Sequence, residues 1–184
     1  MHSYRVSPYR ERALTLLELL TCVIVIAILL VMIFPLYAQV TRRMERTSCM
    51  GNLRGLHTAT NLYVQDHRMW PQIGTQGVEP KAVAAAWIGV LQPYGITQPN
   101  WICPTMQKLL QNPDMSDPEN ARIDYTATNF DQNPMTPFRW STQPWFIETG
   151  DVHGNGNLLV FADGHIQELG DFLSAMKKSP MGGK

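Results

Sequence analysis

An uncharged run from Leu19 to Thr41 constrains the fold of this chain most strongly. It covers 23 positions, and about 20 apolar residues are enough for a helix to span a bilayer. A single carboxylate, that of Glu18, stands at the head of the run. Such a group costs about 2.5–3.5 kcal/mol at the centre of a membrane, so an acid beside a membrane helix is expected to have a function. We therefore expect a membrane helix over residues 14–41 and a specific role for Glu18.

A secretory signal peptide is the alternative interpretation of this region. Its apolar core is about 7–15 residues long and is followed by a cleavage site with small residues at fixed positions. The run here is longer, and Leu36-Tyr37-Ala38 is a poor cleavage site. A retained membrane helix is therefore the expectation.

The residues in front of the run form a motif: Ala13, Leu14, Thr15, two leucines and Glu18. A small residue, an apolar residue, threonine, two aliphatic residues and glutamate resemble the processing site of type IV prepilins and type II secretion pseudopilins. The resemblance implies that a prepilin peptidase removes residues 1–13 by cutting between Ala13 and Leu14, and that Leu14 is then N-methylated. It also implies that Glu18 neutralises the α-amine of a neighbouring subunit during assembly. Pro35 falls where many pilins carry a helix-weakening proline.

A second motif lies near the C-terminus, where His153 is followed after nine residues by Asp163-Gly164. This spacing resembles the H-X9-DG signature of a pseudopilin-like family that is abundant in planctomycetes and verrucomicrobia. The two resemblances together cover most of the chain. They imply that residues 42–184 form a periplasmic head that carries the rest of the long helix.

Residue patterns predict an α+β fold with a pilin-like plan, in which a long N-terminal helix packs on a small antiparallel sheet. The expected helices cover residues 14–67, 80–91 and 171–178, with one turn between 100 and 110, and Asp171 as the cap of the last helix. The expected strands are 123–128, 145–148, 157–162 and 165–169. Asp163-Gly164 between the last two strands predicts a two-residue type I′ turn.

The His153 and Asp163 signature invites a metal or catalytic interpretation, but strand geometry favours two separate tasks. Six residues of strand at about 3.3 Å each place the two ends roughly 20 Å apart. We therefore expect Asp163-Gly164 to make the turn and His153 to hold the glycine-rich loop by hydrogen bonds. A shared metal site remains the alternative.

A calcium site is a second metal hypothesis. Asp151, Asn155 and Asn157 alternate as oxygen ligands of a hard cation do. Such residues beside glycine are more often turn formers. No other cofactor is expected.

Cys22, Cys49 and Cys103 are the three cysteines. Cys22 lies in the apolar run and is expected to pack as a small apolar residue. Cys49 and Cys103 lie outside the cytoplasm in the expected topology, where a disulfide between them would persist. Two buried free thiols are the alternative, because a sequence does not give the separation of the two residues.

The tryptophans, Trp70, Trp87, Trp101, Trp140 and Trp145, are many for a head of this size. They either fill a small core or form a surface for carbohydrate or a protein partner. Core filling is the expected role.

Charge and motifs narrow the expected function. Lys+Arg and Asp+Glu number 15 each, so no nucleic-acid partner is expected. There is no hydrolase elbow, phosphate loop or Cys/His metal spacing, so an enzyme is not expected. The expected function is a subunit of a type II secretion pseudopilus or type IV pilus-like filament, with prepilin peptidase, other subunits and the bacterial inner membrane as partners. One alternative is a membrane-anchored module that binds polysaccharide, and another is a tethered enzyme using His57, His153 or His165.

Overall fold

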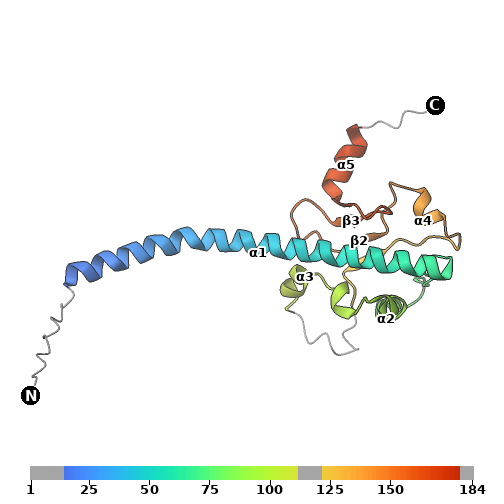
Figure 1. Cartoon of the computed structure of the whole chain (residues 1–184), viewed down its shortest axis with the longest axis horizontal. Helices are drawn as coiled ribbons and strands as arrows, with labels where there is room; N and C mark the ends of the chain where they lie inside the picture. Colours follow the sequence, from blue (N-terminus) through green and yellow to red (C-terminus); the bar gives the residue numbers. More distant parts are fainter. Residues whose placement is uncertain (1–14, 112–121, 179–184) are drawn as a thin grey trace, which may run out of the picture. The chain divides into compact units, whose positions relative to one another are not determined.

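The computed structural model describes residues 15–111 and 122–178, including all of their side chains except those of residues 35, 36 and 38. The elements in chain order are α1 (Leu16–His67), α2 (Pro80–Leu91), the 3-10 helices η1 (Gln92–Tyr94) and η2 (Gln98–Trp101), α3 (Pro104–Leu109), β1 (Tyr125–Ala127), α4 (Thr136–Arg139), β2 (Phe146–Glu148), β3 (Leu158–Val160), β4 (Ile166–Glu168) and α5 (Leu169–Lys178) (Figure 1). The prediction of an α+β chain with a long N-terminal helix and a small antiparallel sheet is confirmed. The chain forms two compact units, Met1–Thr41 and Arg42–Lys184.

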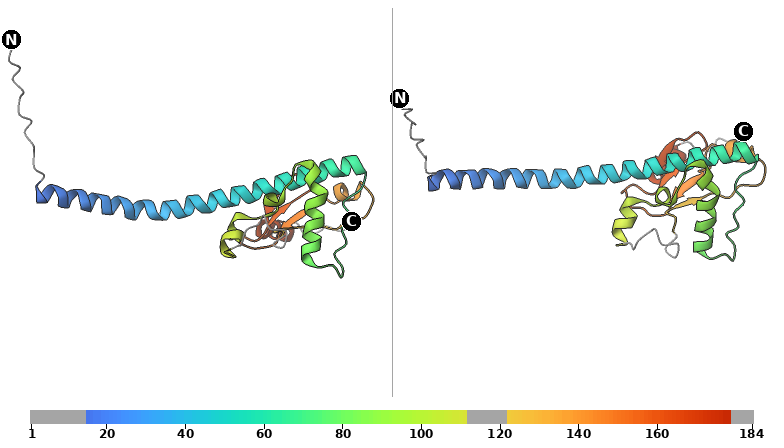
Figure 2. Two further views of the ribbon diagram at one scale, coloured as in Figure 1. Left: turned by 90° about the horizontal axis from the view of Figure 1, so that it is seen from below. Right: turned by 60° about the horizontal axis from the view of Figure 1, so that its bottom comes forward.

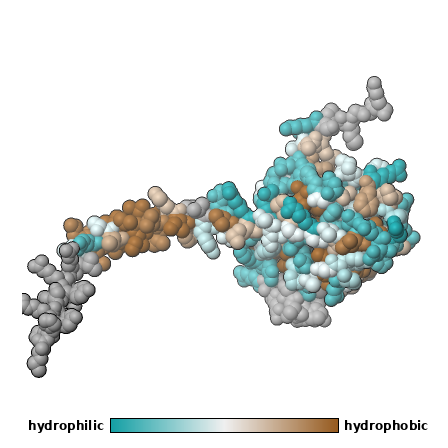
Figure 3. Space-filling model, in the orientation of Figure 1, coloured by the Kyte–Doolittle hydropathy of each residue, from teal (hydrophilic) through white to brown (hydrophobic). Residues whose placement is uncertain are grey.

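In the first unit, α1 is apolar on all sides. Every Leu, Ile, Val, Met and Phe side chain from Leu16 to Phe34 is at least 50% exposed, and Figure 3 shows this stretch as a nearly continuous hydrophobic surface. Pro35 lies inside α1, which continues through it. Among the described residues, α1 is the one helix long and apolar enough to cross a membrane.

In the second unit, α1 becomes amphipathic. Cys49, Leu53, Leu56 and Val64 recur at three- and four-residue steps or their sums and are buried. The rest of the unit packs on one side of this half of the helix (Figure 2).

The four strands form an antiparallel meander in the order β1-β2-β3-β4. Tyr125 of β1 pairs with Glu148 of β2, and Phe146 of β2 pairs with Val160 of β3. All three residues of β3 are buried. The meander brings the C-terminal end of β2 beside β1 and the N-terminal end of β3.

Aromatic rings fill the core of the second unit, as predicted for four of the five tryptophans. Trp70, Trp101 and Trp145 are fully buried and Trp87 nearly so. The ring centroids of Trp70 and Trp145 are 5.1 Å apart, within the range of favourable aromatic pairs. Trp140 differs, since its side chain is 54% exposed.

The turn between β3 and β4 is not the predicted type I′ turn. Gly164 N–H donates to Phe161 O at 2.9 Å, and Phe161 N–H donates to His165 O at 3.0 Å. The loop therefore has three residues, of which only Gly164 has a positive φ, +79°. A type I′ turn requires a positive φ at both central residues, whereas a type I turn followed by a left-handed glycine requires one.

The C-terminal helix also differs from its predicted start. It begins at Leu169, directly after β4, so Asp171 lies in its first turn and is not its cap. The Asp171 carboxylate instead accepts a hydrogen bond from Asn155 Nδ2 at 3.0 Å. Helix α4 was not predicted, because four residues are too few for a periodic pattern.

Candidate functional site

Glu18 closes the N-terminus of α1 in the structure. Thr15 N–H and Thr15 Oγ1 donate to Glu18 Oε2 at 2.9 and 3.0 Å, and Glu18 N–H donates to Thr15 Oγ1 at 3.3 Å. This is a reciprocal capping box, and the Thr-x-x-Glu spacing in the sequence was the signal for it. Ala13 and Leu14 lie outside the described residues.

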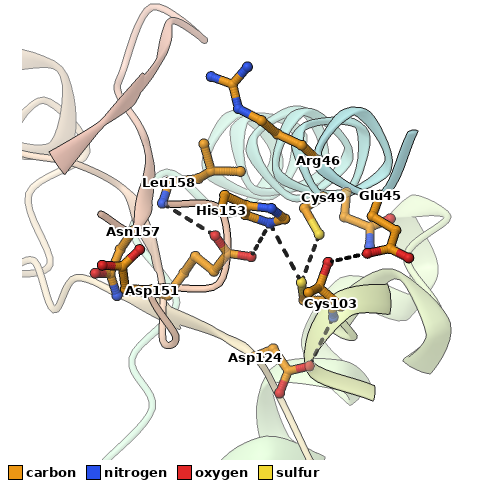
Figure 4. Close-up of polar contacts among 12 residues, drawn as sticks. Glu45, Arg46, Cys49, Cys103, Asp124, Asp151, His153, Asn157 and Leu158 are labelled. Atoms are coloured by element: carbon orange, nitrogen blue, oxygen red, sulfur yellow. Dashed lines mark hydrogen bonds and ion pairs between the residues drawn. The ribbon is translucent and has the colours of Figure 1, made fainter. Parts of the chain in front are cut away.

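A second candidate site lies inside the second unit, where four side chains from separate parts of the chain converge (Figure 4). Cys49 comes from α1, and Cys103 immediately precedes α3. Glu148 is the last residue of β2, and His153 lies in the loop between β2 and β3. All four side chains are buried, with 3% of the His153 side chain exposed.

Short distances connect these four side chains. Cys49 Sγ and Cys103 Sγ are 2.8 Å apart, and both residues are free thiols. His153 Nε2 lies 3.8 Å from Cys103 Sγ and 3.2 Å from Glu148 Oε1. One donor atom from each residue lies within 4.8 Å of all the others. The arrangement therefore offers two sulfurs, one nitrogen and one oxygen to a common point.

Hydrogen bonds to neighbouring residues hold two of the four residues in place. Glu148 Oε2 accepts a hydrogen bond from Leu158 N–H at 3.3 Å. Cys103 N–H donates to the buried carboxylate of Asp124 at 2.9 Å, and Asp124 also accepts from Arg122 Nη2 at 3.0 Å. The glutamate oxygen that faces His153 is thus oriented by the strand next to it.

Burial and hydrogen bonds set the protonation of the site. Loss of contact with water raises the pKa of Glu148 to about 7. The pKa of Cys103 falls to about 6, first because the Cys49 thiol donates to it and also because backbone N–H groups of Met106 and Thr105 favour the thiolate. The pKa of Cys49 is raised by the same hydrogen bond and by burial. The same hydrogen bond therefore favours the thiolate on Cys103 and the thiol on Cys49.

His153 and the Asp163-Gly164 pair lie at different places in the second unit. Asp163 Oδ1 accepts a hydrogen bond from His165 N–H at 2.9 Å within the β3–β4 turn. His153 instead contacts Glu148 and Cys103, so its partners are side chains of the buried cluster.

The residues of the calcium hypothesis hold the loop between β2 and β3. Asp151 Oδ1 accepts a hydrogen bond from Gly156 N–H at 3.1 Å. Asn157 Nδ2 donates to Glu148 O at 2.6 Å, and Asn155 donates to Asp171 as described above. The three side chains therefore have separate partners, and calcium binding stays a prediction.

The other histidines of the tethered-enzyme alternative have different surroundings. His57 Nε2 lies 3.0 Å from Ala162 O, and the His57 ring packs on Trp145 at 4.8 Å. His165 is exposed. Each of the three histidines thus contacts a different set of groups.

Glu148 is the member of the cluster that the sequence patterns did not single out. A signal was present, because alternate residues of a strand face the same side of a sheet. Phe146 is an obvious core residue, and Glu148, two positions on, shares its face. An acid at a core-facing strand position is a reason to look for a partner.

Comparison with known proteins adds no assignment. No protein-family model, curated protein or solved structure matches the chain.

Proposed function

We propose that the chain is a prepilin-like subunit that is stored in the bacterial inner membrane through α1 and assembles into a type II secretion pseudopilus or a type IV pilus-like filament. Its proposed partners are a prepilin peptidase and other subunits of the same kind. The supporting observation is that α1 is one helix with two surfaces. It is apolar and exposed from Leu16 to Phe34, and amphipathic and packed within the second unit.

An all-apolar helix needs either lipid or other helices around it. Lipid tails are about as apolar as leucine side chains, so moving such a helix from lipid into a bundle of similar helices changes its hydrophobic environment little. Packing between close-fitting helices and polar pairing then decide the equilibrium. This balance allows the same segment to serve as an anchor and as the core of a filament.

Glu18 provides the polar pairing in this proposal. Cleavage between Ala13 and Leu14 creates a new α-amine, which is a cation at neutral pH. A carboxylate and an ammonium in an apolar surrounding each carry a large desolvation cost, which is offset only when they pair. Pairing between Glu18 of one subunit and the Leu14 amine of the next therefore favours a defined stagger between subunits.

The decisive measurement is mass spectrometry of the mature N-terminus from the native host. A chain that begins at methylated Leu14 is the expected result. An intact Met1, or a cut after residue 38, would contradict the proposal.

Assembly is tested separately with Glu18→Gln, which keeps the size of the side chain and removes its charge. We expect the variant to reach the membrane but to give less than a tenth of the wild-type subunit–subunit cross-links and surface filaments. Glu79→Gln is the matched control, because Glu79 is exposed and its side chain makes no capping hydrogen bond. A wild-type chain that is processed but never cross-links would favour the anchored binding module instead.

A further inference from the structure

We propose that Cys49, Cys103, Glu148 and His153 together bind one divalent cation of the zinc class. The site lies wholly within the second unit. The proposed metal binding can therefore be tested independently of processing and filament assembly.

Two of the separations between the donor atoms are close to those of a tetrahedral zinc site. Zinc–sulfur bonds of about 2.3 Å and zinc–nitrogen or zinc–oxygen bonds of about 2.0–2.2 Å place neighbouring donors about 3.3–3.8 Å apart. Cys103 Sγ to His153 Nε2 is 3.8 Å, and His153 Nε2 to Glu148 Oε1 is 3.2 Å. The two sulfurs, at 2.8 Å, have to separate by about 1 Å, and all four donor atoms already lie within 4.8 Å of one another.

The chemistry of the donors selects the class of cation. Two thiolates and an imidazole are soft or borderline ligands that favour zinc over calcium or magnesium, whose preferred ligands are oxygens. Zinc binding releases the protons of any thiol still protonated, so that both cysteines bind as thiolates. The total charge of the ligands is −3, from two thiolates and one carboxylate, because the imidazole is neutral. A divalent cation reduces the charge of the site to −1. The hydrogen bond from Leu158 N–H to Glu148 stabilises that remaining charge, and so do the backbone N–H groups of Thr105 and Met106, which favour the thiolate of Cys103.

Burial of the four residues supports a ligand rather than ordinary packing. A buried acid–histidine pair such as Glu148 with His153 is often no more stabilising than apolar side chains of the same volume. Two thiols beside the pair add weak hydrogen bonds only. A bound ion would offset the cost of burying all four polar side chains at once. It would also connect α1, the start of α3, the end of β2 and the following loop.

A disulfide between Cys49 and Cys103 is the competing state, and it excludes the metal. Its formation removes two electrons and two protons from the thiols and requires an oxidant, such as the disulfide of a thiol oxidoreductase. The bonded sulfurs are no longer thiolates, so only His153 and Glu148 remain as ligands. Counting thiols therefore distinguishes the two states.

The first experiment measures the thiol state in cells that express the full-length protein. Cells are quenched in acid, and the denatured protein is alkylated without reduction and analysed by mass spectrometry. We expect alkylation of Cys22, Cys49 and Cys103 alike. A chain alkylated only at Cys22, with Cys49 linked to Cys103, would overturn the proposal.

The second experiment titrates the reduced full-length chain in detergent micelles with Co²⁺ and then with Zn²⁺. We expect one equivalent of Co²⁺ to produce thiolate-to-cobalt charge transfer and the intense visible bands of a tetrahedral site, and Zn²⁺ to remove both. This test uses the unaltered protein, so it does not depend on the folding of a variant. A reduced protein without these bands would also overturn the proposal.

Variants then identify the ligands. We expect Cys103→Ser and His153→Gln each to weaken Zn²⁺ binding, measured by competition with a chromophoric chelator, by more than the about 10–100-fold typical of losing an outer-shell partner. Cys22→Ser and His165→Gln are the matched controls and should leave the affinity within twofold of wild type. Equal affinity of the two sets of variants would place the ion elsewhere and refute the assignment.

Discussion

At the scale of single residues, Gly164 shows why the β3–β4 turn needs glycine. Its φ of +79° lies in the left-handed region, which costs a residue with a Cβ about 1–2 kcal/mol. A Cβ built at this position would also lie 3.3 Å from Cε1 of His57. Gly89 is the opposite case, because it lies within helix α2 and a Cβ there would meet nothing within 4 Å.

Alanine at the two positions should therefore change stability in opposite directions. We expect Gly164→Ala to lower the free energy of unfolding by about 1–2 kcal/mol. Gly89→Ala should raise it by up to about 1 kcal/mol, because alanine is the better helix former. Urea unfolding of the full chain in micelles, followed by tryptophan fluorescence, measures both. A change of the same sign in the two variants would contradict this explanation.

At the scale of elements, α1 has two parts with different surroundings. Its first part is apolar and exposed, while in its last part a buried stripe alternates with an exposed face. Leu56 is fully buried under the sheet and aromatic core, whereas Leu62 is 43% exposed on the same helix. Ion pairs at the edge of this packing join Glu45 to Lys108 of α3 and Arg46 to Glu168 of β4. The basic partner of each pair is exposed, at 45% for Arg46 and 64% for Lys108, so water screens the pairs and the helix is held mainly by its apolar stripe.

Truncation of the two leucines separates packing from helix propensity. Leu56→Ala should lower the free energy of unfolding by about 2–5 kcal/mol, since it removes a buried side chain and leaves a cavity. Leu62→Ala should stay within about 0.5 kcal/mol of wild type. Both values come from the same urea titration. A small loss in Leu56→Ala would mean that the second unit does not depend on α1 for its core.

At the scale of the whole molecule, two compact units differ in the solvent that each requires. The described part of Met1–Thr41 exposes apolar side chains from Leu16 to Phe34, while Arg42–Lys184 has a buried aromatic core and a sheet. The boundary falls where the uncharged run ends and Arg42 follows. Water is therefore a suitable solvent for the second unit only.

Lysines in the first unit test this difference. Replacing Ile26 and Leu29 by lysine should cost about 3–4 kcal/mol per site for membrane insertion. We expect the double variant to appear in the soluble fraction after alkaline carbonate extraction. The matched control, Thr58→Lys with Leu62→Lys on the exposed face of the second unit, should remain in the membrane pellet. Retention of both variants in the pellet would show that another feature anchors the chain.

Local patterns determined most of the elements. The helices expected over residues 14–67 and 80–91 match α1 and α2 closely, because helix formation depends on residues three or four positions apart. The apolar runs around residues 125, 146, 158 and 166 predicted the four strands, although their ends and the type of the last turn were wrong. Ends depend on hydrogen bonds to other elements, as with Asp171 and Asn155, and these are not visible in a local pattern.

The buried cluster was decided by the tertiary structure. The sequence allowed a pairing of Cys49 with Cys103, but it did not single out Glu148. For His153 the sequence favoured a role in its own loop, with a metal site shared with Asp163 as the alternative. Their four donor atoms meet because α1 packs on the sheet and β2 pairs with β1 and β3. Cys49 and Cys103 are 54 residues apart in the sequence, Cys103 and His153 are 50 apart, and Glu148 and His153 are 5 apart. That packing brings the side chains of each pair within hydrogen-bond range. The sequence by itself determined which segment is apolar enough for a membrane; the meeting of sulfur, nitrogen and oxygen in the core depended on how the elements pack.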